Sequence, residues 1–261
     1  MKRWTLRGLT QGDGTSYGLL AGQIDGLDAP PIRAADAPFQ GRDGAVGGAD
    51  DYGSRTLGFP TGLSAPNEII EDREAYAMAL LRPWKQAWRV STTDLELELQ
   101  VDHLWGPEVA ETVSFFGRPR VADLDISGVH GGVVAGLAEF VCLDPFAYGP
   151  SHSTTELLAA SPLVFTVPGD VPTRRFTIAV AGNGGTPVVS STTEARSMAW
   201  SSALAGGETV TLDFVTTTAQ QDGVDVYPFS IDEWFTLQPG ANILTFSGCA
   251  SITVAYRGAY L

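Results

Sequence analysis

Cysteine is scarce in this sequence. Two cysteines occur in 261 residues, Cys142 and Cys249, and they are far apart in the chain. A disulfide framework requires several paired cysteines, so a disulfide-stabilised secreted fold is excluded. Both cysteines lie in apolar, strand-like stretches, FVCLDP and FSGCAS, which predicts that their thiols are buried. We therefore expect the chain to be synthesised in a reducing cytoplasm.

Long apolar runs are also missing. No stretch approaches 18 consecutive apolar residues, and the N-terminal MKRWTLRGLTQG has no apolar run of signal-peptide length. From this we expect no membrane span and no secretory leader.

Basic residues are few. The 16 Lys and Arg residues stand against 30 Asp and Glu, which gives a net charge of −14. Sequence-independent binding to nucleic acid requires a basic surface that displaces counterions, so this charge argues against that function. It is compatible with a protein past which nucleic acid slides without binding.

Motifs of catalysis and metal binding are absent from the sequence. The histidines, His103, His130 and His152, lie well apart, and no HExxH, GxSxG or phosphate-loop pattern occurs. We therefore predict no catalytic residue, no cofactor and no metal site.

The clearest strand pattern lies at residues 94–102. Leucine and valine alternate there with acidic and amide residues, and the acidic set is Asp94, Glu96 and Glu98. A period of two predicts a half-buried strand with one acidic face. Glycosidase chemistry needs two carboxyl groups in different environments around one bond, so we interpret these three carboxylates as a solvated face.

Aromatic residues suggest one candidate binding site. Trp200, Trp234 and Phe235 lie in the C-terminal half of the chain, where their rings could form a platform for stacking sugar rings. Packing inside a hydrophobic core is the alternative role for aromatic side chains on alternating strands. The sequence leaves both roles open.

The length of the chain favours two domains. Apolar alternation stops at Asp144-Pro145 and a polar Ser/Thr segment follows, so we predict domains at residues 1–150 and 151–261. From about residue 160, short strand patterns recur every 8–12 residues between turns, which is typical of a β-sandwich or jelly roll. The predicted fold class is mainly β.

The N-terminal half is predicted to contain one hairpin and one helix. Strand patterns at 3–9 and 15–24 flank Gly12-Asp13-Gly14, a hairpin signal. The helix is predicted at 67–82, with Asn67 as its N-cap and Pro83 as its end.

Residues 24–59 form a long stretch rich in Gly, Asp, Pro and Ala, with few apolar residues and no sustained periodicity. We call this stretch the arm. Loops of this length within compact domains are usually functional or disordered. Ordering each residue costs about 1–2 kcal/mol in backbone entropy, so an arm with few apolar anchors needs burial against another surface. We predict that it lies along a surface of its own or a neighbouring subunit.

Several short motifs, in their order and spacing, are similar to those of the distal tail (Dit) proteins of long-tailed phages, in particular the minor tail proteins of actinobacteriophages. The resemblance covers essentially the whole chain. The matching residues are Gly41, Arg42, Asp43, Gly44, Tyr52, Gly53 and Arg55 in the arm, Asp144, Pro145 and Tyr148 at the junction, and Leu237, Pro239, Gly240, Asn242 and Tyr256–Leu261 at the end.

The resemblance implies a structural, non-enzymatic virion protein at the tail tip. It implies a tail-tube-like N-terminal domain that assembles as a homo-hexameric ring and a galectin-like C-terminal domain. The ring would join the tail-tube protein to the tail-tip hub protein, with the tape-measure protein as a further partner, and would keep a channel open for genomic DNA. Six copies would carry 6 × −14 = −84 charges, which suits passage of DNA rather than binding.

The resemblance and the residues together give three sets of candidate site residues. Subunit-interface candidates are Phe39, Arg42, Asp43, Tyr52 and Arg55; lumen-facing candidates are Asp94, Glu96 and Glu98; candidates for sugar stacking are Trp200 and Trp234. The chain lacks the large insertions of saccharide-binding family members. A carbohydrate-binding module for host attachment is the alternative function, and a hydrolase with an attached β-sandwich is a second competitor.

Overall fold

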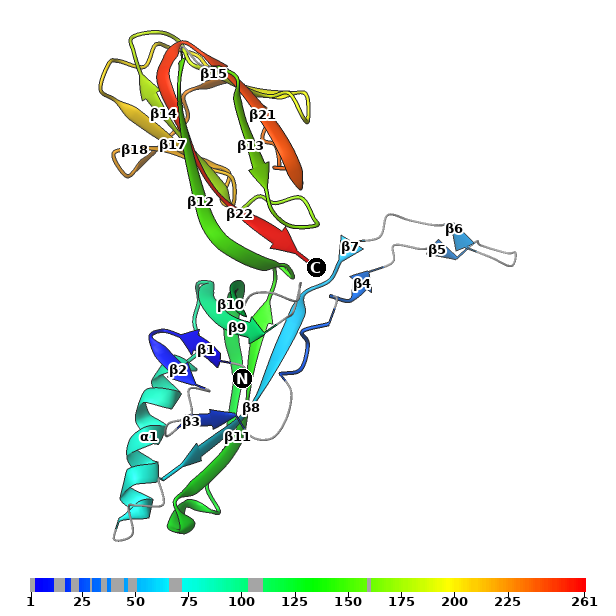
Figure 1. Ribbon diagram of the computed structural model, residues 1–261, viewed down its shortest axis with the longest axis vertical. Helices are drawn as coiled ribbons and strands as arrows, with labels where there is room; N and C mark the ends of the chain where they lie inside the picture. Colours follow the sequence, from blue (N-terminus) through cyan, green and yellow to red (C-terminus); the bar gives the residue numbers. More distant parts are fainter. Residues whose placement is uncertain are drawn as a thin grey trace. The chain divides into compact units, whose positions relative to one another are not determined.

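The computed structural model describes residues 3–11, 17–19, 24–28, 30–33, 37–38, 45–46, 51–65, 72–102, 110–158 and 161–261. The chain divides into two compact units. Unit 1 comprises residues 1–147 and Leu261, and unit 2 comprises residues 148–260. Each unit is described by itself below (Figure 1).

Unit 1 is built around one antiparallel sheet with the order β2-β1-β9-β10-β11-β8-β3. Its strands are β1 (Arg3–Leu6), β2 (Leu9–Gln11), β3 (Tyr17–Leu19), β8 (Arg55–Ser64), β9 (Leu95–Asp102), β10 (Ala110–Asp125) and β11 (Val133–Cys142). The long strand β10 pairs with β9 through its first half and with β11 through its second half. A register shift between Pro119 and Val121 marks the bulge beyond this change of partner.

The first hairpin of unit 1 differs from the prediction. Strand β1 ends at Leu6, and β2 follows after Arg7 and Gly8, which both have positive φ (49° and 77°). Two successive positive φ values are those of the tight type I′ hairpin turn, whose twist matches the flanking strands. The predicted single strand at 3–9 is therefore wrong, and Gly12-Asp13-Gly14 lies outside the described residues.

The helix α1 runs from Arg73 to Ala87. Asp72 is its N-cap and accepts a hydrogen bond from the amide of Ala75. The predicted end at Pro83 is wrong: Pro83 lies inside the helix. The burial of Trp84, Ala87 and Trp88 in the core accounts for this, because tertiary packing of the last turn offsets the hydrogen bond that proline cannot donate. The predicted cap at Asn67 lies outside the described residues.

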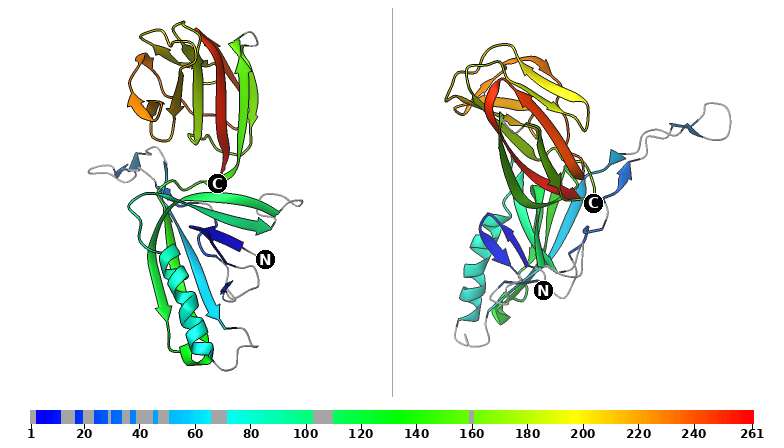
Figure 2. Two further views of the ribbon diagram at one scale, coloured as in Figure 1. Left: turned by 90° about the vertical axis from the view of Figure 1, so that its left-hand side faces the viewer. Right: turned by 45° about the horizontal axis from the view of Figure 1, so that its top comes forward.

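The core of unit 1 is an aromatic cluster between α1 and the sheet. Trp4 lies 5.7 Å from Phe59 and 5.3 Å from Trp88, measured between ring centroids, and Phe59 lies 5.4 Å from Trp88. Trp84 lies 6.1 Å from Trp88. Edge-on and tilted rings of this kind bury large apolar areas. In Figure 2, α1 runs beside strands of the sheet, in agreement with its contacts to β8 and β11.

Unit 2 is a sandwich of two antiparallel sheets. The first has the order β12-β22-β14-β17-β18-β19 and the second β13-β21-β15-β16-β20. The strands are β12 (Ala147–Leu157), β13 (Leu163–Val167), β14 (Phe176–Gly182), β15 (Val188–Ser191), β16 (Arg196–Trp200), β17 (Thr209–Asp213), β18 (Thr218–Gln221), β19 (Val224–Val226), β20 (Phe229–Asp232), β21 (Gly240–Ser247) and β22 (Cys249–Tyr260).

Alternate residues of both sheets point into one shared core, as the buried face of β14 shows. Asp222-Gly223, a dipeptide that suits a tight hairpin turn, joins β18 to β19, and both residues have positive φ. Asn183-Gly184-Gly185 is also a sequence that suits a tight hairpin, but it does not form one here. This segment joins β14 to β15, which belong to different sheets, so it connects the two layers of the sandwich.

The mainly β fold class is confirmed, with α1 the one α-helix of the described residues and a short 3₁₀ turn, η1 (Val129–Gly131), before β11. Both cysteine thiols are buried and unpaired with each other, as predicted. Within the described ranges, no helix has the length and apolarity that a membrane crossing requires.

Candidate interaction surfaces

The arm contains two short antiparallel ladders. Strand β4 (Ile32–Arg33) pairs with β7 (Asp51–Tyr52), and β5 (Ala37–Pro38) pairs with β6 (Ala45–Val46). These registers make the described parts of the arm the two sides of one hairpin, which the lack of strand periodicity did not predict. Its strands have two residues each, too few to give a period-two signal. Phe39, Arg42 and Asp43 lie outside the described residues.

The root of the arm is held on strand β8. The amide of Asp25 donates to the carbonyl oxygen of Gly58 at 3.0 Å, and the amide of Gly58 donates back to Asp25 at 3.1 Å. Between them Gly26 has φ +79°, and a Cβ there would lie 2.0 Å from the carbonyl oxygen of Thr56. Glycine is therefore required for this close approach.

Tyr52 also holds the base of the arm in place, at the end of strand β7. Its ring meets Phe146 edge-on, with the ring centroids 5.7 Å apart, and it remains 41% exposed. The amide of the next residue, Gly53, donates to the carbonyl oxygen of Pro31 at 2.6 Å. Tyr52 is thus a partly buried aromatic side chain at the base of the arm, and its exposed part is available for contact with another subunit.

Arg55 has a different place from the one expected. Its side chain is 2% exposed, inside unit 1, with the guanidinium 5.5 Å from the centroid of the Phe115 ring. Burial lowers the pKa of the guanidinium, and the charges of Cys142 and Asp28 act in the opposite direction. Arg55 is therefore not a surface contact of the arm. A lone Arg in a polar stretch gives no sequence signal of such burial.

The acidic face of β9 is present as predicted. Leu97 and Leu99 are fully buried, while Asp94, Glu96 and Glu98 are exposed on the other side of the strand. The neighbouring strand β1 has the same polarity, because Trp4 and Leu6 pair with Leu99 and Leu97. The acidic residues thus lie on the side of the sheet that faces away from the core.

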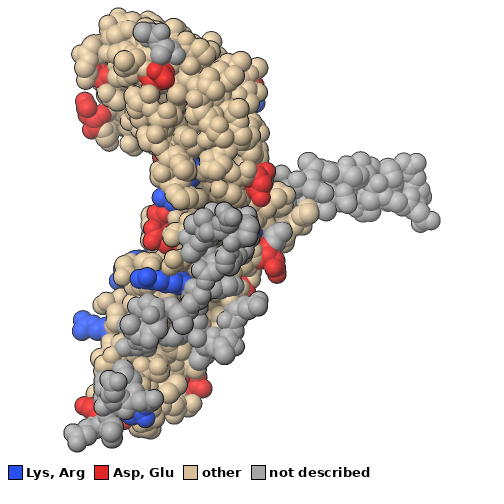
Figure 3. Space-filling view, in the orientation of Figure 1, with Lys and Arg blue, Asp and Glu red and all other residues tan. Residues whose placement is uncertain are grey.

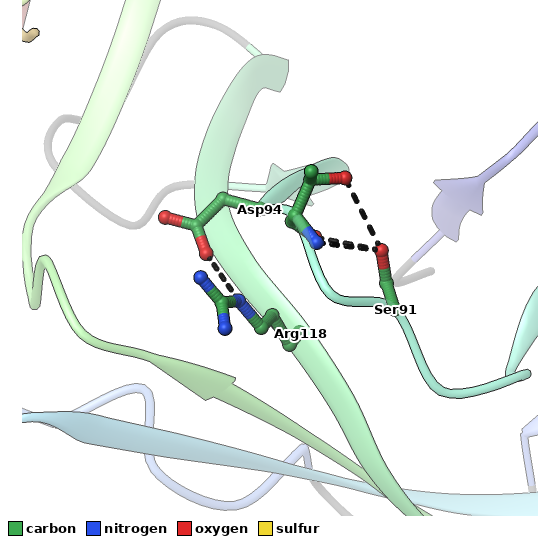
Figure 4. Close-up of polar contacts among 4 residues, drawn as sticks. Ser91, Asp94 and Arg118 are labelled. Atoms are coloured by element: carbon green, nitrogen blue, oxygen red, sulfur yellow. Dashed lines mark hydrogen bonds and ion pairs between the residues drawn. The ribbon is translucent and has the colours of Figure 1, made fainter.

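Neighbouring strands partly neutralise this face. Asp94 forms an ion pair with Arg118 of β10, with Nε 2.8 Å from Oδ1 (Figure 4). The hydroxyl of Ser114 donates to Glu96 at 2.6 Å. Glu98 lies in register with Thr5 on one side and Ser114 on the other. Asp94 is thus ion-paired, whereas Glu96 accepts from a hydroxyl group and Glu98 lies beside two hydroxyl residues.

The structure does not bring the two tryptophans into a stacking platform. Trp200 is 3% exposed and packs edge-on against Phe229, with the ring centroids 5.2 Å apart. Trp234 is partly buried against Phe214 and Phe229. Sugar stacking requires an open ring face, so Trp200 has the core role that the sequence left as the alternative.

Tyr227 is an exposed aromatic residue in the described part of unit 2, and sequence reasoning did not single it out. It is 73% exposed, and its hydroxyl donates to Asp232 at 2.5 Å. That hydrogen bond, with desolvation and the charge of Asp232, raises the pKa of Tyr227. The sequence did contain a signal for this exposure: Tyr227 lies beside Pro228 in the short connection between β19 and β20, and a tyrosine in such a connection is seldom part of the core.

The part of the chain that the structure describes contains no group of three or more His, Cys, Asp or Glu side chains that could hold a metal ion. His130 contacts Glu74 at 2.6 Å, and His152 stacks on Tyr256. These contacts join one element to another rather than converging on a common point.

Comparison with known proteins adds two findings. Residues 168–260 match the family described as siphovirus-type tail component, C-terminal domain. The whole chain is similar to the crystal structure of the Dit protein of phage SPP1, described as a paradigm of the hub adsorption apparatus in phages that infect Gram-positive bacteria; 100% of each chain is covered at 16% identity, with a TM-score of 0.73.

Chains of the phage p2 baseplate in its activated conformation are also similar. For the calcium form, 99% of this chain and 98% of the other are covered at 9% identity, with a TM-score of 0.57. For the strontium form, 98% of each is covered at 9% identity, with a TM-score of 0.56. No curated protein sequence matches the chain. The resemblance to the Dit family is confirmed by the C-terminal match and by the fold.

Proposed function

We propose that this protein forms the hub ring of a phage tail, because residues 168–260 match the siphovirus-type tail component C-terminal domain and the whole chain is similar in fold to a Dit protein. In this proposal six copies form a ring between the tail-tube protein and the tail-tip hub protein, and the tape-measure protein and genomic DNA pass through its centre. Unit 1 forms the ring in the manner of tail-tube subunits, and unit 2 projects as a galectin-like sandwich. The protein acts at the virion tail tip and catalyses no reaction.

The observation that carries the proposal is that both units follow one known Dit structure along their whole length. Two features of the chain support it. The arm exposes Tyr52 beside a long segment with few apolar residues, as expected for an element that is buried by a neighbour. The acidic face of β9 is polar and points away from the core.

We assign this acidic face to the lumen. Negative charge along a channel repels DNA phosphates, so the nucleic acid passes without being held. Glu96 and Glu98 lie within strand β9 itself, so they are the residues that this assignment depends on most.

Negative-stain imaging of the purified protein tests the proposal. We expect rings with a central opening and six-fold symmetry. Monomers at all concentrations, or compact assemblies without an opening, would contradict it. The competing function as a carbohydrate-binding module predicts glycan binding by monomers, which a glycan array on the same sample measures.

A further inference from the structure

A basic stripe runs along the outer side of α1. It consists of Met78, Leu81, Arg82, Lys85, Gln86 and Arg89, which together line a hollow. The spacing follows the helix period, so these side chains share one face. Met78 is 48% exposed although it is apolar. We call this surface the α1 stripe.

The charge of the stripe is opposite to that of the protein. Residues 73–89 contain four basic residues and one acidic residue, a net charge of 4 − 1 = +3, in a chain of net charge −14. The acidic residue, Glu74, contacts His130. Arg82, Lys85 and Arg89 are exposed and make no ion pair with any described residue. Figure 3 shows blue side chains over the part of unit 1 that carries α1 and the β1–β2 hairpin.

The arm has the complementary chemistry. Residues 34–51 contain Asp36, Asp43, Asp50 and Asp51 against one basic residue, Arg42, a net charge of 1 − 4 = −3. The same segment carries Phe39 and Val46, whose apolar side chains suit the exposed, apolar Met78. Nine residues of extended chain between Arg33 and the middle of the segment span about 30 Å at about 3.3 Å per residue, enough to cross a subunit boundary.

We propose that the α1 stripe of one subunit is the seat of the arm of the next subunit. The described strands of the arm pair with each other through their backbones. A surface and a complementary segment on one chain make a head-to-tail contact, which closes into a ring when the rotation permits. This inference rests on the proposed ring and names the surface on which its subunits meet.

Nucleic acid is the other ligand that a basic stripe attracts. Three exposed cations on a chain of net charge −14 would attract the phosphates of nucleic acid only weakly. A phosphate backbone would not bury the exposed, apolar side chain of Met78, whereas the apolar residues of the arm would. Both the positive charge of the α1 stripe and its exposed Met78 therefore favour the arm as the segment that binds there.

Charge reversal tests the stripe. We expect the double variant Arg82→Glu/Arg89→Glu to weaken assembly at least tenfold, measured as the concentration at which the ring dissociates in light scattering after size exclusion. The matched control Arg120→Glu/Arg174→Glu reverses two exposed cations elsewhere and should assemble as the wild type does. Equal assembly of the stripe variant and the control would overturn the inference.

Charge exchange tests the occupant. The arm variant Asp43→Arg/Asp50→Arg should also weaken assembly, and its combination with Arg82→Glu/Arg89→Glu should restore it, because the two charge patterns match again. If the combined variant failed to assemble, the arm would not be the segment that binds the α1 stripe. The same would follow if the wild type bound DNA and the stripe variant did not.

Disulfide trapping provides a measurement independent of charge. Mixed samples of Asp43→Cys and Arg82→Cys should form a disulfide-linked dimer on oxidation, since both native thiols are buried, whereas Asp43→Cys mixed with Arg174→Cys should not. Rings that form normally without this dimer would refute the seat and leave the proposed function standing. Absence of wild-type rings would refute both.

Discussion

The guanidinium of Arg7, in the turn of the first hairpin, donates a hydrogen bond of 2.9 Å to the carbonyl oxygen of Arg89, just beyond the end of α1. The same group reaches the carbonyl oxygens of Gln86 and Ala87 at 3.1 and 3.4 Å. A cation thereby contacts the carbonyl groups at the C-terminus of the helix, where the helix dipole favours positive charge.

We predict that Arg7→Ala lowers the free energy of unfolding by about 1 kcal/mol, because an exposed, charge-assisted cap is lost. Chemical denaturation with a helix-sensitive signal measures this. The control Arg3→Ala, on the same hairpin, should change stability by less than about 0.5 kcal/mol. Equal effects of the two substitutions would show that Arg7 does not cap α1.

We predict that Trp200→Ala lowers the free energy of unfolding by about 3–5 kcal/mol, because the indole fills the core of unit 2. Tyr227→Ala, at a residue that is 73% exposed, should change it by about 0.5 kcal/mol or less. Thermal unfolding measures both. A stable Trp200→Ala variant that had lost glycan binding would instead favour the sugar-stacking role.

Stability is predicted to depend on pH through Glu194. Burial acts to raise the pKa of this carboxyl group, but hydrogen bonds from Thr236 and Gln238, with attraction to Arg196, outweigh it and lower the pKa. A lowered folded-state pKa contributes stability above the unfolded value of about 4.3, and this contribution is lost as pH falls through the folded value.

The Glu194→Gln variant should therefore have a lower melting temperature than the wild type at pH 7, and the difference should shrink as the pH falls below about 4. Asp222→Asn, at an exposed turn residue, serves as the control with no such pH-dependent difference. A gap for Glu194→Gln that stays constant between pH 7 and pH 3 would contradict the assignment.

The lumen assignment predicts that Glu96→Lys/Glu98→Lys rings bind double-stranded DNA, with an affinity that falls steeply as salt rises. Wild-type rings should not bind. The control Asp123→Lys/Asp225→Lys makes the same charge change at other exposed residues, and its binding should be much weaker. Gel-shift titrations at several salt concentrations distinguish these cases, and equal binding by both variants would refute the assignment.

The sequence predicted those features that repeat. Strand β9 and its acidic face follow from an alternation of nine residues, and the sandwich follows from regularly spaced strands. It failed where tertiary packing overrides local signals: Pro83 lies inside α1 because Trp84 and Trp88 fill the core, and Arg55 is buried although its neighbours are polar. The short ladders of the arm leave no periodic trace, so only the register in the structure shows the hairpin.

The register of the arm also permits a direct test of whether the arm holds the ring together. Arg33 and Asp51 are cross-strand partners, so replacing residues 34–50 with Asn-Gly closes the hairpin with a two-residue turn and preserves its root. The measurement is the mass of the assembled particles by light scattering, for the full chain and this variant. We predict six copies for the full chain and monomers for the variant; a monomeric full chain, or equal masses for both, would refute the role of the arm in assembly.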